Sequence, residues 1–486
     1  MILAEVLRDM AFVYARGAGG ALSVTDVAYD SRSVVPGALF VCVPGAVMDG
    51  HRFAADAVSR GAAALIVERE LDLAVPQVIV PDARDALALA SANFFGNASR
   101  HMRVAGVTGT AGKTTVAMLV EHMLNATGTD CGLLGTVCYR KGQRVFPSRY
   151  TTPESRDLQE VLGAMRDMGA QAASMEVSSH ALLTHRCAHT HFTAAAFTNL
   201  SREHMDLHED MEDYFATKVR LFMEEDVSSR VVCTSTQWGS RLAGMLRRAH
   251  MESVEVSCDP GADVRLLEVL PRGIVGCDVC AVAFGRSLRF ALPMVGDFNA
   301  MNALVALALV HELGCDLTGA SASLASFAGV PGRMERIDTG DRGFAVFVDY
   351  AHTPEELGRA IGAARKVASG RLAVVFGCGG DRDRGKRPMM GREAIQADMV
   401  VVTNDNPRSE DPADIATETV AGMGVDASRA HVQLDRRRAI RDALAWARPG
   451  DVVLIAGKGH ESTQSAGGQT IRFDDREVAR EELANL

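Results

Sequence analysis

The residues with the clearest chemical signature are the ten from Gly106 to Thr115, which read GVTGTAGKTT. Gly-Lys-Thr-Thr after spaced glycines is typical of a loop that binds nucleotide phosphates, although Val107 stands where the commonest pattern has its first glycine. The glycines let the backbone curve until its N–H groups point at an anion. Lys113 can then face the terminal phosphates, and the Thr114 hydroxyl can reach a magnesium ion.

A loop of this kind needs a strand before it and a helix after it. The apolar run from Met102 to Val107 predicts the strand. The helix is predicted by apolar residues at the spacing of one helix face, which are Val116, Leu119, Val120, Met123 and Leu124. Because a helix N-terminus carries unpaired N–H groups and the positive end of the dipole, it favours a bound phosphate. The segment therefore predicts nucleotide binding.

Polar clusters follow five further apolar runs, at the point where each run ends. Glu176, Ser178, Ser179 and His180 follow the run in AASMEVSSH, and His204 and Asp206 follow the run in FTAAAFTNLSREHMD. The remaining clusters lie in LAVVFGCGGDRDRGKR, MVVVTNDNPRSEDP and VVLIAGKGHE. Open parallel sheets bind ligands beyond the carboxyl ends of their strands, so these clusters are expected to share a crevice.

The length of 486 residues is too great for one core and predicts three units. Gly and Pro follow a helical pattern in residues 328–336, and a second seam lies in residues 84–101, before the phosphate-loop strand. The expected domains are therefore residues 1–95, 96–330 and 331–486.

The charge balance argues against a general nucleic-acid binder. Lys plus Arg number 51 and Asp plus Glu number 61, which gives a net charge of -10 without a basic tail. Charged residues in MILAEVLRDM exclude a signal peptide core, and no long uncharged apolar run predicts a membrane anchor. Ten scattered cysteines indicate a reduced, cytoplasmic protein, and the C-x-x-C at Cys277 to Cys280 predicts a half-buried strand in preference to a metal or redox site.

With these motifs in order, the chain resembles the Mur ligase family, and within it the ligases that add the third residue of the peptidoglycan stem peptide. The family's phosphate loop is spaced G-x-x-G-x-x-G-K, as here. The other matching motifs are YDSRSVVPGALFVCVPG, YTTPES, EVSSHAL, FTNLSREHMDLH, GDFNAMNALVA, GVPGRMER, VDYAHTPEEL, GCGGDRDRGKRPMM, DNPRSEDP, AGKGHE and FDDREVA, which together span nearly the whole chain.

The resemblance implies an α/β fold of three domains. These are an N-terminal UDP-binding α/β domain, a central P-loop ATPase domain with a mostly parallel sheet, and a C-terminal Rossmann-like α/β domain that closes on the central one. The implied activity is an ATP- and magnesium-dependent ligation in peptidoglycan precursor synthesis, hence in cell wall formation. UDP-N-acetylmuramoyl-L-alanyl-D-glutamate would receive meso-diaminopimelate through an acyl phosphate, in a cytoplasmic enzyme that is a monomer, with no nucleic-acid partner.

The resemblance also assigns the nucleotide and metal residues. It implies ATP contacts from Thr110, Ala111, Gly112, Lys113, Thr114, Thr115, Asn299, Arg333 and Asp349. Magnesium ligands would be Thr114 and Glu176 at one site, and His204 and carbamylated Lys218 at a second. His352 would lie near the transferred phosphate, which makes Lys113, Lys218 and His352 the catalytic set. From the residues alone, Lys218 is more simply a solvated helix lysine.

Two further sets of residues would hold the other substrates. Contacts to the UDP-dipeptide are implied for Ser31, Thr151, Thr152, Ser178 and Arg186, and contacts to the amino acid for Arg382, Asp405, Asn406, Pro407, Arg408, Gly457 and Glu461. In this family DNPR accompanies meso-diaminopimelate, whose distal carboxylate suits the bidentate donors of Arg408. The alternatives are L-lysine or L-ornithine as the added amino acid, and an Arg408 that merely pairs with Glu410 or Asp411.

Several positions depart from the family pattern. Ala111 replaces a usual asparagine in the phosphate loop, Tyr150 replaces a frequent asparagine, and Thr184 stands where glutamine is common. Because the backbone cradle does not depend on the side chain at 111, activity is expected to survive that change.

Two other classes of protein, and one enzyme of the same superfold, remain as alternatives. A Rossmann oxidoreductase lacks support because GCGGDR ends on Arg382 where a third glycine belongs. A nucleotide-dependent switch protein would not need the carboxyl-terminal motifs, and the DSR and DNPR motifs favour a muramyl ligase over a folylpolyglutamate synthase.

Overall fold

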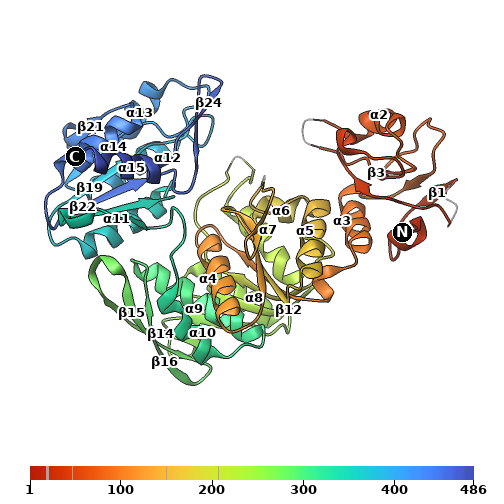
Figure 1. Ribbon diagram of the computed structural model, residues 1–486, viewed down its shortest axis with the longest axis horizontal. Coiled ribbons are helices and arrows are strands. Elements are labelled where there is room, and N and C mark those ends of the chain that lie inside the picture. The colour runs from red at the N-terminus through yellow and green to blue at the C-terminus, as the bar shows by residue number, and fades with distance from the viewer. Residues whose placement is uncertain (18–20, 46–47, 149, 206) are drawn as a thin grey trace.

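The computed structural model describes residues 1–17, 21–45, 48–148, 150–205 and 207–486. Figure 1 shows three lobes, with the red N-terminal lobe and the blue C-terminal lobe on opposite sides of the central one. Each lobe contains its own main sheet, which confirms the predicted α/β class. Asp206 of the polar cluster after Phe197 lies outside the described residues. Among the described residues, no helix is both long and apolar enough to cross a lipid bilayer.

The N-terminal lobe is a five-stranded sheet in the order β1-β5-β4-β3-β2, parallel except for β1. Val27, Leu39, Ile66 and Val78 from this sheet pack against α3 in a small core. The elements are α1 (Leu3–Val6), β1 (Tyr14–Arg16), β2 (Val27–Ala28), β3 (Leu39–Val41), α2 (Ala54–Ser59), β4 (Ala64–Val67), β5 (Gln77–Ile79) and α3 (Ala83–Phe94).

The central lobe contains an eleven-stranded sheet whose middle is parallel and whose two ends are antiparallel. Its order is β16-β15-β14-β13-β12-β11-β6-β10-β7-β8-β9. The strands are β6 (Arg103–Thr108), β7 (Cys131–Leu134), β8 (Tyr139–Lys141), β9 (Arg144–Phe146), β10 (Ala172–Glu176), β11 (Phe192–Phe197), β12 (Val227–Cys233), β13 (Val254–Ser257), β14 (Val264–Pro271), β15 (Cys277–Ala283) and β16 (Arg286–Leu292).

Seven helices are described in the central lobe. They are α4 (Lys113–Ala126), α5 (Ser155–Asp167), α6 (Ser179–Leu183), α7 (Met211–Met223), α8 (Gln237–Arg248), α9 (Asp297–Glu312) and α10 (Leu317–Ser323). The five apolar residues predicted to form one face of α4 are all fully buried, and α9 packs beside α4 with nearly all of its apolar residues in the same core.

The phosphate-loop strand begins one residue later than predicted. β6 runs from Arg103 because the Arg103 N–H makes the first ladder bond, to Gln171, and it continues to Thr108, which pairs with Phe197. The strand predicted at the C-x-x-C is confirmed as β15, in which burial alternates. Cys277 and Cys280 therefore face opposite sides of the sheet and cannot share a metal ion.

The C-terminal lobe is a six-stranded sheet in the order β17-β18-β22-β19-β20-β21, parallel except for β17, with helices on both faces. Its elements are β17 (Glu335–Ile337), β18 (Ala345–Asp349), α11 (Pro354–Val367), β19 (Leu372–Phe376), α12 (Lys386–Ala394), β20 (Met399–Val402), α13 (Pro412–Ala421), β21 (Ala430–Val432), α14 (Arg436–Trp446), β22 (Val452–Ala456), β23 (Thr463–Ala466), β24 (Gln469–Arg472) and α15 (Asp475–Ala484). β23 and β24 form a separate two-stranded hairpin.

Candidate active site

The polar clusters predicted to meet do lie in one crevice between the central and C-terminal lobes. This crevice encloses about 680 Å³ and is lined from the phosphate loop, from the segments that follow β10 and β11, and from the segments that follow β19, β20 and β22. These strands are parallel within their sheets, so in each sheet their carboxyl ends share one edge, and both edges line the crevice. The arrangement can bring three different ligands together.

The phosphate loop has the backbone that an anion site needs. Gly109 and Gly112 have φ of +146° and +87°, values that a side chain would disfavour. The Lys113 ammonium donates to the carbonyl oxygens of Gly109 (2.9 Å) and Thr110 (2.7 Å), so it lies folded over the loop. At the site of the missing asparagine, the Ala111 backbone is held by Asn199, whose side chain accepts from its N–H at 3.0 Å and donates to its carbonyl at 3.0 Å.

Thr114 and Glu176 lie together beside this loop, as a shared magnesium ion requires. Their side-chain oxygens are 3.0 Å apart, and Glu176 is only 1% exposed. Thr136 donates to the same carboxylate through its N–H and its hydroxyl, which orients it. Among the described residues no group of three His, Cys, Asp or Glu side chains gathers as a metal site. Magnesium commonly takes one or two carboxylates and completes its shell with water and phosphate oxygens, so the pair fits it.

Lys218 is not the solvated helix lysine that its residue type alone favours. It is 1% exposed, donates to the Gly109 carbonyl at 2.9 Å and lies 4.6 Å from the centre of the Tyr214 ring. Burial, and then the neighbouring charge of Lys113, hold the pKa of Lys218 well below its usual value. Helix α7 points this side chain inward because Tyr214, Phe215 and Leu221 also pack toward the core.

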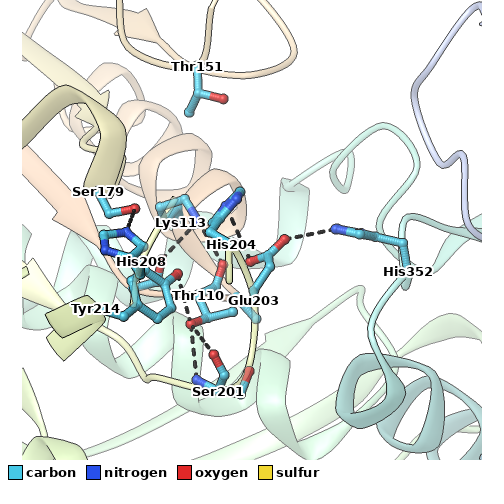
Figure 2. Close-up of polar contacts among 12 residues, drawn as sticks. Thr110, Lys113, Thr151, Ser179, Ser201, Glu203, His204, His208, Tyr214 and His352 are labelled. Atoms are coloured by element: carbon cyan, nitrogen blue, oxygen red, sulfur yellow. Dashed lines mark hydrogen bonds and ion pairs between the residues drawn. The ribbon is translucent and has the colours of Figure 1, made fainter. Parts of the chain in front are cut away.

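His204 and His352 approach the site from different lobes, and Glu203 lies between them (Figure 2). The His352 Nε2 atom is 2.8 Å from Glu203 Oε1, whereas the His204 Nε2 atom is 3.7 Å from Glu203 Oε2. Burial lowers the pKa of His352, but the carboxylates of Glu356 and Glu203 outweigh it and raise the pKa to about 9. His352 is therefore an imidazolium that joins the C-terminal lobe to the central one.

A second pocket gathers most of the residues expected to contact ATP. Ala111, Gly112, Thr115, Asn299, Arg333 and Asp349 line it, together with Phe298 and Asn302. Burial raises the pKa of Asp349 to about 6, against the opposing effects of Arg333 and the N–H groups of Met334 and Ala351. The same carboxylate accepts from these two N–H groups at 2.6 and 2.8 Å, so it is firmly held.

Four of the five residues expected to contact the UDP-dipeptide line the main crevice. They are Thr151, Thr152, Ser178 and Arg186. Thr152 anchors the group, since its hydroxyl donates to the Glu176 carbonyl at 2.9 Å and its own carbonyl accepts from Arg186 at 3.2 Å. Ser31 is apart from them, buried in the N-terminal lobe after β2.

The residues expected to contact the amino acid come from the C-terminal lobe. Arg382, Asp405, Asn406, Arg408, Gly457 and Glu461 all line the crevice, whereas Pro407 does not. Asn406 donates to Glu461 Oε2 at 3.0 Å. The alternative in which Arg408 pairs with Glu410 or Asp411 is wrong: Glu410 binds Arg387, Asp411 caps α13, and Arg408 donates to the Gly380 carbonyl.

Sequence reasoning missed several polar residues in and around this crevice, of which Glu203 and Lys458 contact residues that it did predict. Glu203 was passed over for the neighbouring His204, although a carboxylate in the same segment was itself a signal. Lys458 is fully buried and donates to Glu461 Oε2 (3.1 Å) and Asn406 Oδ1 (3.3 Å). Its position directly after the apolar run of VVLIAGKGHE, where the other strands also carry polar residues, was the available signal.

Comparison with known proteins agrees with this geometry. The Mur ligase middle domain matches residues 107–310, the Mur ligase glutamate ligase domain matches 332–459, and the Mur ligase family catalytic domain matches 23–105. A UDP-N-acetylmuramoyl-L-alanyl-D-glutamate--2,6-diaminopimelate ligase of Gloeobacter violaceus is 45% identical over 470 residues, which cover 95% of this chain and 94% of the relative.

Two solved structures extend the likeness to three dimensions. A UDP-N-acetylmuramoyl-L-alanyl-D-glutamate--2,6-diaminopimelate ligase is 31% identical with a TM-score of 0.73, and the match covers 100% of this chain and 99% of that one. MurF ligase from Thermotoga maritima, in complex with ADP, is 20% identical with a TM-score of 0.65 and covers 95% and 97% of the two chains. At that identity the second match shows a shared fold.

Proposed function

This chain belongs to the Mur ligase family, and from that premise we propose that it is an ATP-dependent ligase that adds meso-diaminopimelate to UDP-N-acetylmuramoyl-L-alanyl-D-glutamate. The observation that carries the proposal is the single crevice in which the phosphate loop faces Arg408 and Glu461. A nucleotide hydrolase or switch protein would need the phosphate loop but would have no need of Arg408 and Glu461. The relatives' substrates make L-lysine and L-ornithine the less favoured alternatives.

The chemistry has two steps. A carboxylate oxygen of the D-glutamate side chain attacks the γ-phosphorus of ATP, the bond to the β-phosphate oxygen breaks, and ADP leaves. The amine of meso-diaminopimelate then attacks the acyl carbon, the bond from carbon to the phosphate oxygen breaks, and phosphate leaves as the nitrogen loses a proton. The D-glutamate carboxylate and the γ-phosphate of ATP are both anionic, so the site must neutralise their charge and hold them in line.

Residues of the central lobe are assigned to the phosphates. Lys113 and the N–H groups of Gly112 to Thr115 would bind the β- and γ-phosphates, with Thr110 and Ala111, whose N–H groups donate to Asn199, completing the loop. Asn299, Arg333 and Asp349 would hold the adenosine. Thr114 and Glu176 would hold one magnesium ion, and His204 with a carbamylated Lys218 a second. Bound magnesium supplies charge neutralisation of the transferring phosphoryl group.

Carbamylation of Lys218 is supported by its surroundings. A buried amine with a lowered pKa is neutral for more of the time, and a neutral amine is the form that reacts with carbon dioxide. The product is an anionic oxygen ligand in place of a cation, which suits a site that binds magnesium. His352 would donate from its imidazolium to the transferred phosphate.

The other residues are assigned to substrate binding. Ser31, Thr151, Thr152, Ser178 and Arg186 would hold the UDP-dipeptide. Arg408 would bind the distal carboxylate of meso-diaminopimelate and Glu461 an ammonium group, with Arg382, Asp405, Asn406, Pro407 and Gly457 completing the pocket.

The same proposal extends to organisation. Residues 1–95, 96–330 and 331–486 would act as the UDP-binding, ATP-binding and amino-acid-binding domains, and each range holds one main sheet. Closure of the third domain on the second would keep water from the acyl phosphate. A monomer is sufficient because one chain lines the whole crevice, and a cytoplasmic location follows from the use of ATP.

The test is phosphate release by the purified enzyme with ATP, magnesium and each combination of UDP-muramyl precursor and amino acid. We expect turnover only with the UDP-linked dipeptide, and with meso-diaminopimelate preferred over L-lysine and L-ornithine at equal concentration. Preference for L-lysine or L-ornithine would contradict the amino-acid assignment and leave the ligase assignment standing. No turnover with any combination would contradict both.

A further inference from the structure

The β23–β24 hairpin has no place in the function described so far. It leaves the sheet after β22 as two short antiparallel strands joined at Gly467 and Gly468, and all of β24 is exposed. Two-stranded hairpins are marginally stable in water unless they pack on something else. Its stability therefore depends on a neighbour, and the neighbour that it contacts is the loop of residues 405–408.

Backbone bonds join the hairpin to this loop. The Arg408 N–H donates to the Ser465 carbonyl at 3.0 Å, and the Gly467 N–H donates to the Arg408 carbonyl at 2.7 Å. Arg408 thus pairs with Ala466 as in a parallel ladder. Gln464 adds a side-chain bond from its Nε2 atom to the Asp405 carbonyl, at 2.8 Å.

Arg408 adopts a backbone conformation that arginine rarely takes. Its φ is +53°, in the left-handed region that side chains other than glycine, asparagine and aspartate disfavour. Such a conformation persists only where its surroundings hold it. Here the hairpin holds both polar backbone groups of Arg408, and this conformation directs the guanidinium toward the Gly380 carbonyl at the crevice wall.

The hairpin also sets the direction of the Asn406 amide. Its Oδ1 atom accepts from the Ser465 N–H at 3.0 Å and lies 3.3 Å from the Lys458 ammonium. With two donors on the oxygen, the NH₂ group must face Glu461, 3.0 Å away. Flipping the amide would set a donor against two donors.

We propose that the β23–β24 hairpin is a specificity-determining element, which positions Arg408 and Asn406 to recognise the distal end of an amino acid carrying a second carboxylate. The proposal rests on the function proposed above. Selectivity would then depend on hydrogen bonds between the hairpin and residues 405–408. A substitution in the hairpin would change which amino acid is used although the hairpin itself makes no contact with the substrate.

The sharpest test compares two substitutions at Gly467 in the full-length enzyme. Gly467→Pro removes the N–H that bonds to Arg408 and cannot take the φ of +54°, whereas Gly467→Asn keeps the N–H, has open space for its Cβ and is among the few side chains that tolerate this left-handed φ. For Gly467→Pro we expect KM for meso-diaminopimelate to rise about tenfold or more, with KM for ATP and for the UDP-dipeptide unchanged. The ratio of kcat/KM for meso-diaminopimelate to that for L-lysine should fall by a similar factor, and Gly467→Asn should stay near wild type.

A second pair keeps the proposal testable if Gly467→Pro does not fold, as judged by its Tm. Gln464→Leu removes the bond to Asp405, while Gln469→Leu changes an exposed glutamine on the opposite strand. We expect about a threefold rise in KM for meso-diaminopimelate in the first variant and none in the second.

Unchanged KM and unchanged selectivity in folded Gly467→Pro, or equal effects of Gln464→Leu and Gln469→Leu, would overturn the proposal. A rise in all three KM values would also overturn it, because general loosening of the lobe would explain that result. Failure of the wild-type enzyme to use any amino acid would instead contradict the proposed function.

Discussion

The phosphate loop and the proposed amino-acid pocket both place cations where an anionic group would bind, but they are built differently. The loop belongs to one continuous ten-residue segment, Gly106 to Thr115, that runs from the end of β6 to the first turn of α4, and its lysine bonds to carbonyls three and four residues away. The amino-acid pocket draws on segments near residues 380, 406 and 458 and is held by the hairpin at 463–472. A local motif survives changes elsewhere, whereas a pocket held from a distance can be altered from a distance.

The largest effect is expected in the loop itself. Lys113→Ala should reduce kcat by a hundredfold or more, on the order found when a preorganised donor to a transition-state charge is removed. Folding should be unaffected, because the side chain is only partly buried and bonds to loop carbonyls. Phosphate release and Tm measure the two effects, and retained turnover would contradict the assignment.

Substitution of Lys218 tests whether the phosphate-binding part of the site depends on a modified residue. Lys218→Ala should lose activity, and Lys218→Arg should not restore it, because a guanidinium cannot be carbamylated and repels magnesium. Intact mass measured under gentle conditions should reveal the added carboxyl group on Lys218. An unmodified ammonium in the active enzyme with substrates bound would refute carbamylation.

Substitution in the buried pair of Arg436 and Asp475 tests how far the C-terminal lobe depends on contacts behind the proposed amino-acid pocket. Both side chains are fully buried and 2.6 Å apart, and Arg436 also donates to the carbonyls of Asn404 and Ala456. Asp475→Asn leaves a buried cation without its counter-charge, so the free energy of unfolding should fall by about 3–5 kcal/mol. Denaturant unfolding measures it; a fall below 1 kcal/mol, the usual range for an exposed pair, would contradict this reading.

Arg408 tests the contact that the pocket makes with its ligand. Arg408→Ala should weaken recognition of meso-diaminopimelate by about 2–5 kcal/mol, seen as a higher KM, with KM for ATP and the UDP-dipeptide nearly unchanged. Arg384→Ala is the matched control, because Arg384 is an exposed arginine nearby that forms an ion pair with Glu418. Equal effects of the two substitutions would show that only general charge matters.

The smallest effect concerns the contact between the two lobes. The pKa of His352 is raised from 6.5 to about 9, so its interaction with Glu203 and Glu356 stabilises the fold fully below pH 6.5 and is lost as pH rises through 9. The difference in unfolding free energy between wild type and His352→Gln should therefore shrink from pH 6 to pH 10. A difference that stays constant over this range would contradict the ion pair.

Much of the site could be predicted from local sequence. The α4 face is encoded by five apolar residues within nine positions, and the strand ends that carry Glu176, His204, Asn406 and Gly457 are encoded by apolar runs followed by polar residues. Parallel pairing then requires the ends within each sheet to meet, so the two polar sheet edges that line the crevice followed from pattern. The individual partners inside it did not.

The amino-acid sequence by itself determined the three α/β lobes, the phosphate loop and which strand ends carry polar groups, because periodicity and glycine spacing act within a window of about 15 residues. Only the tertiary structure decided that Lys218 is buried, that Glu203 meets His352 from another lobe, and that a hairpin holds Arg408 in a left-handed conformation. Glu203 and His352 are 149 residues apart, and Arg408 and its hairpin partner Ser465 are 57 apart in number. Contacts over such separations depend on how whole sheets pack, which no local pattern encodes.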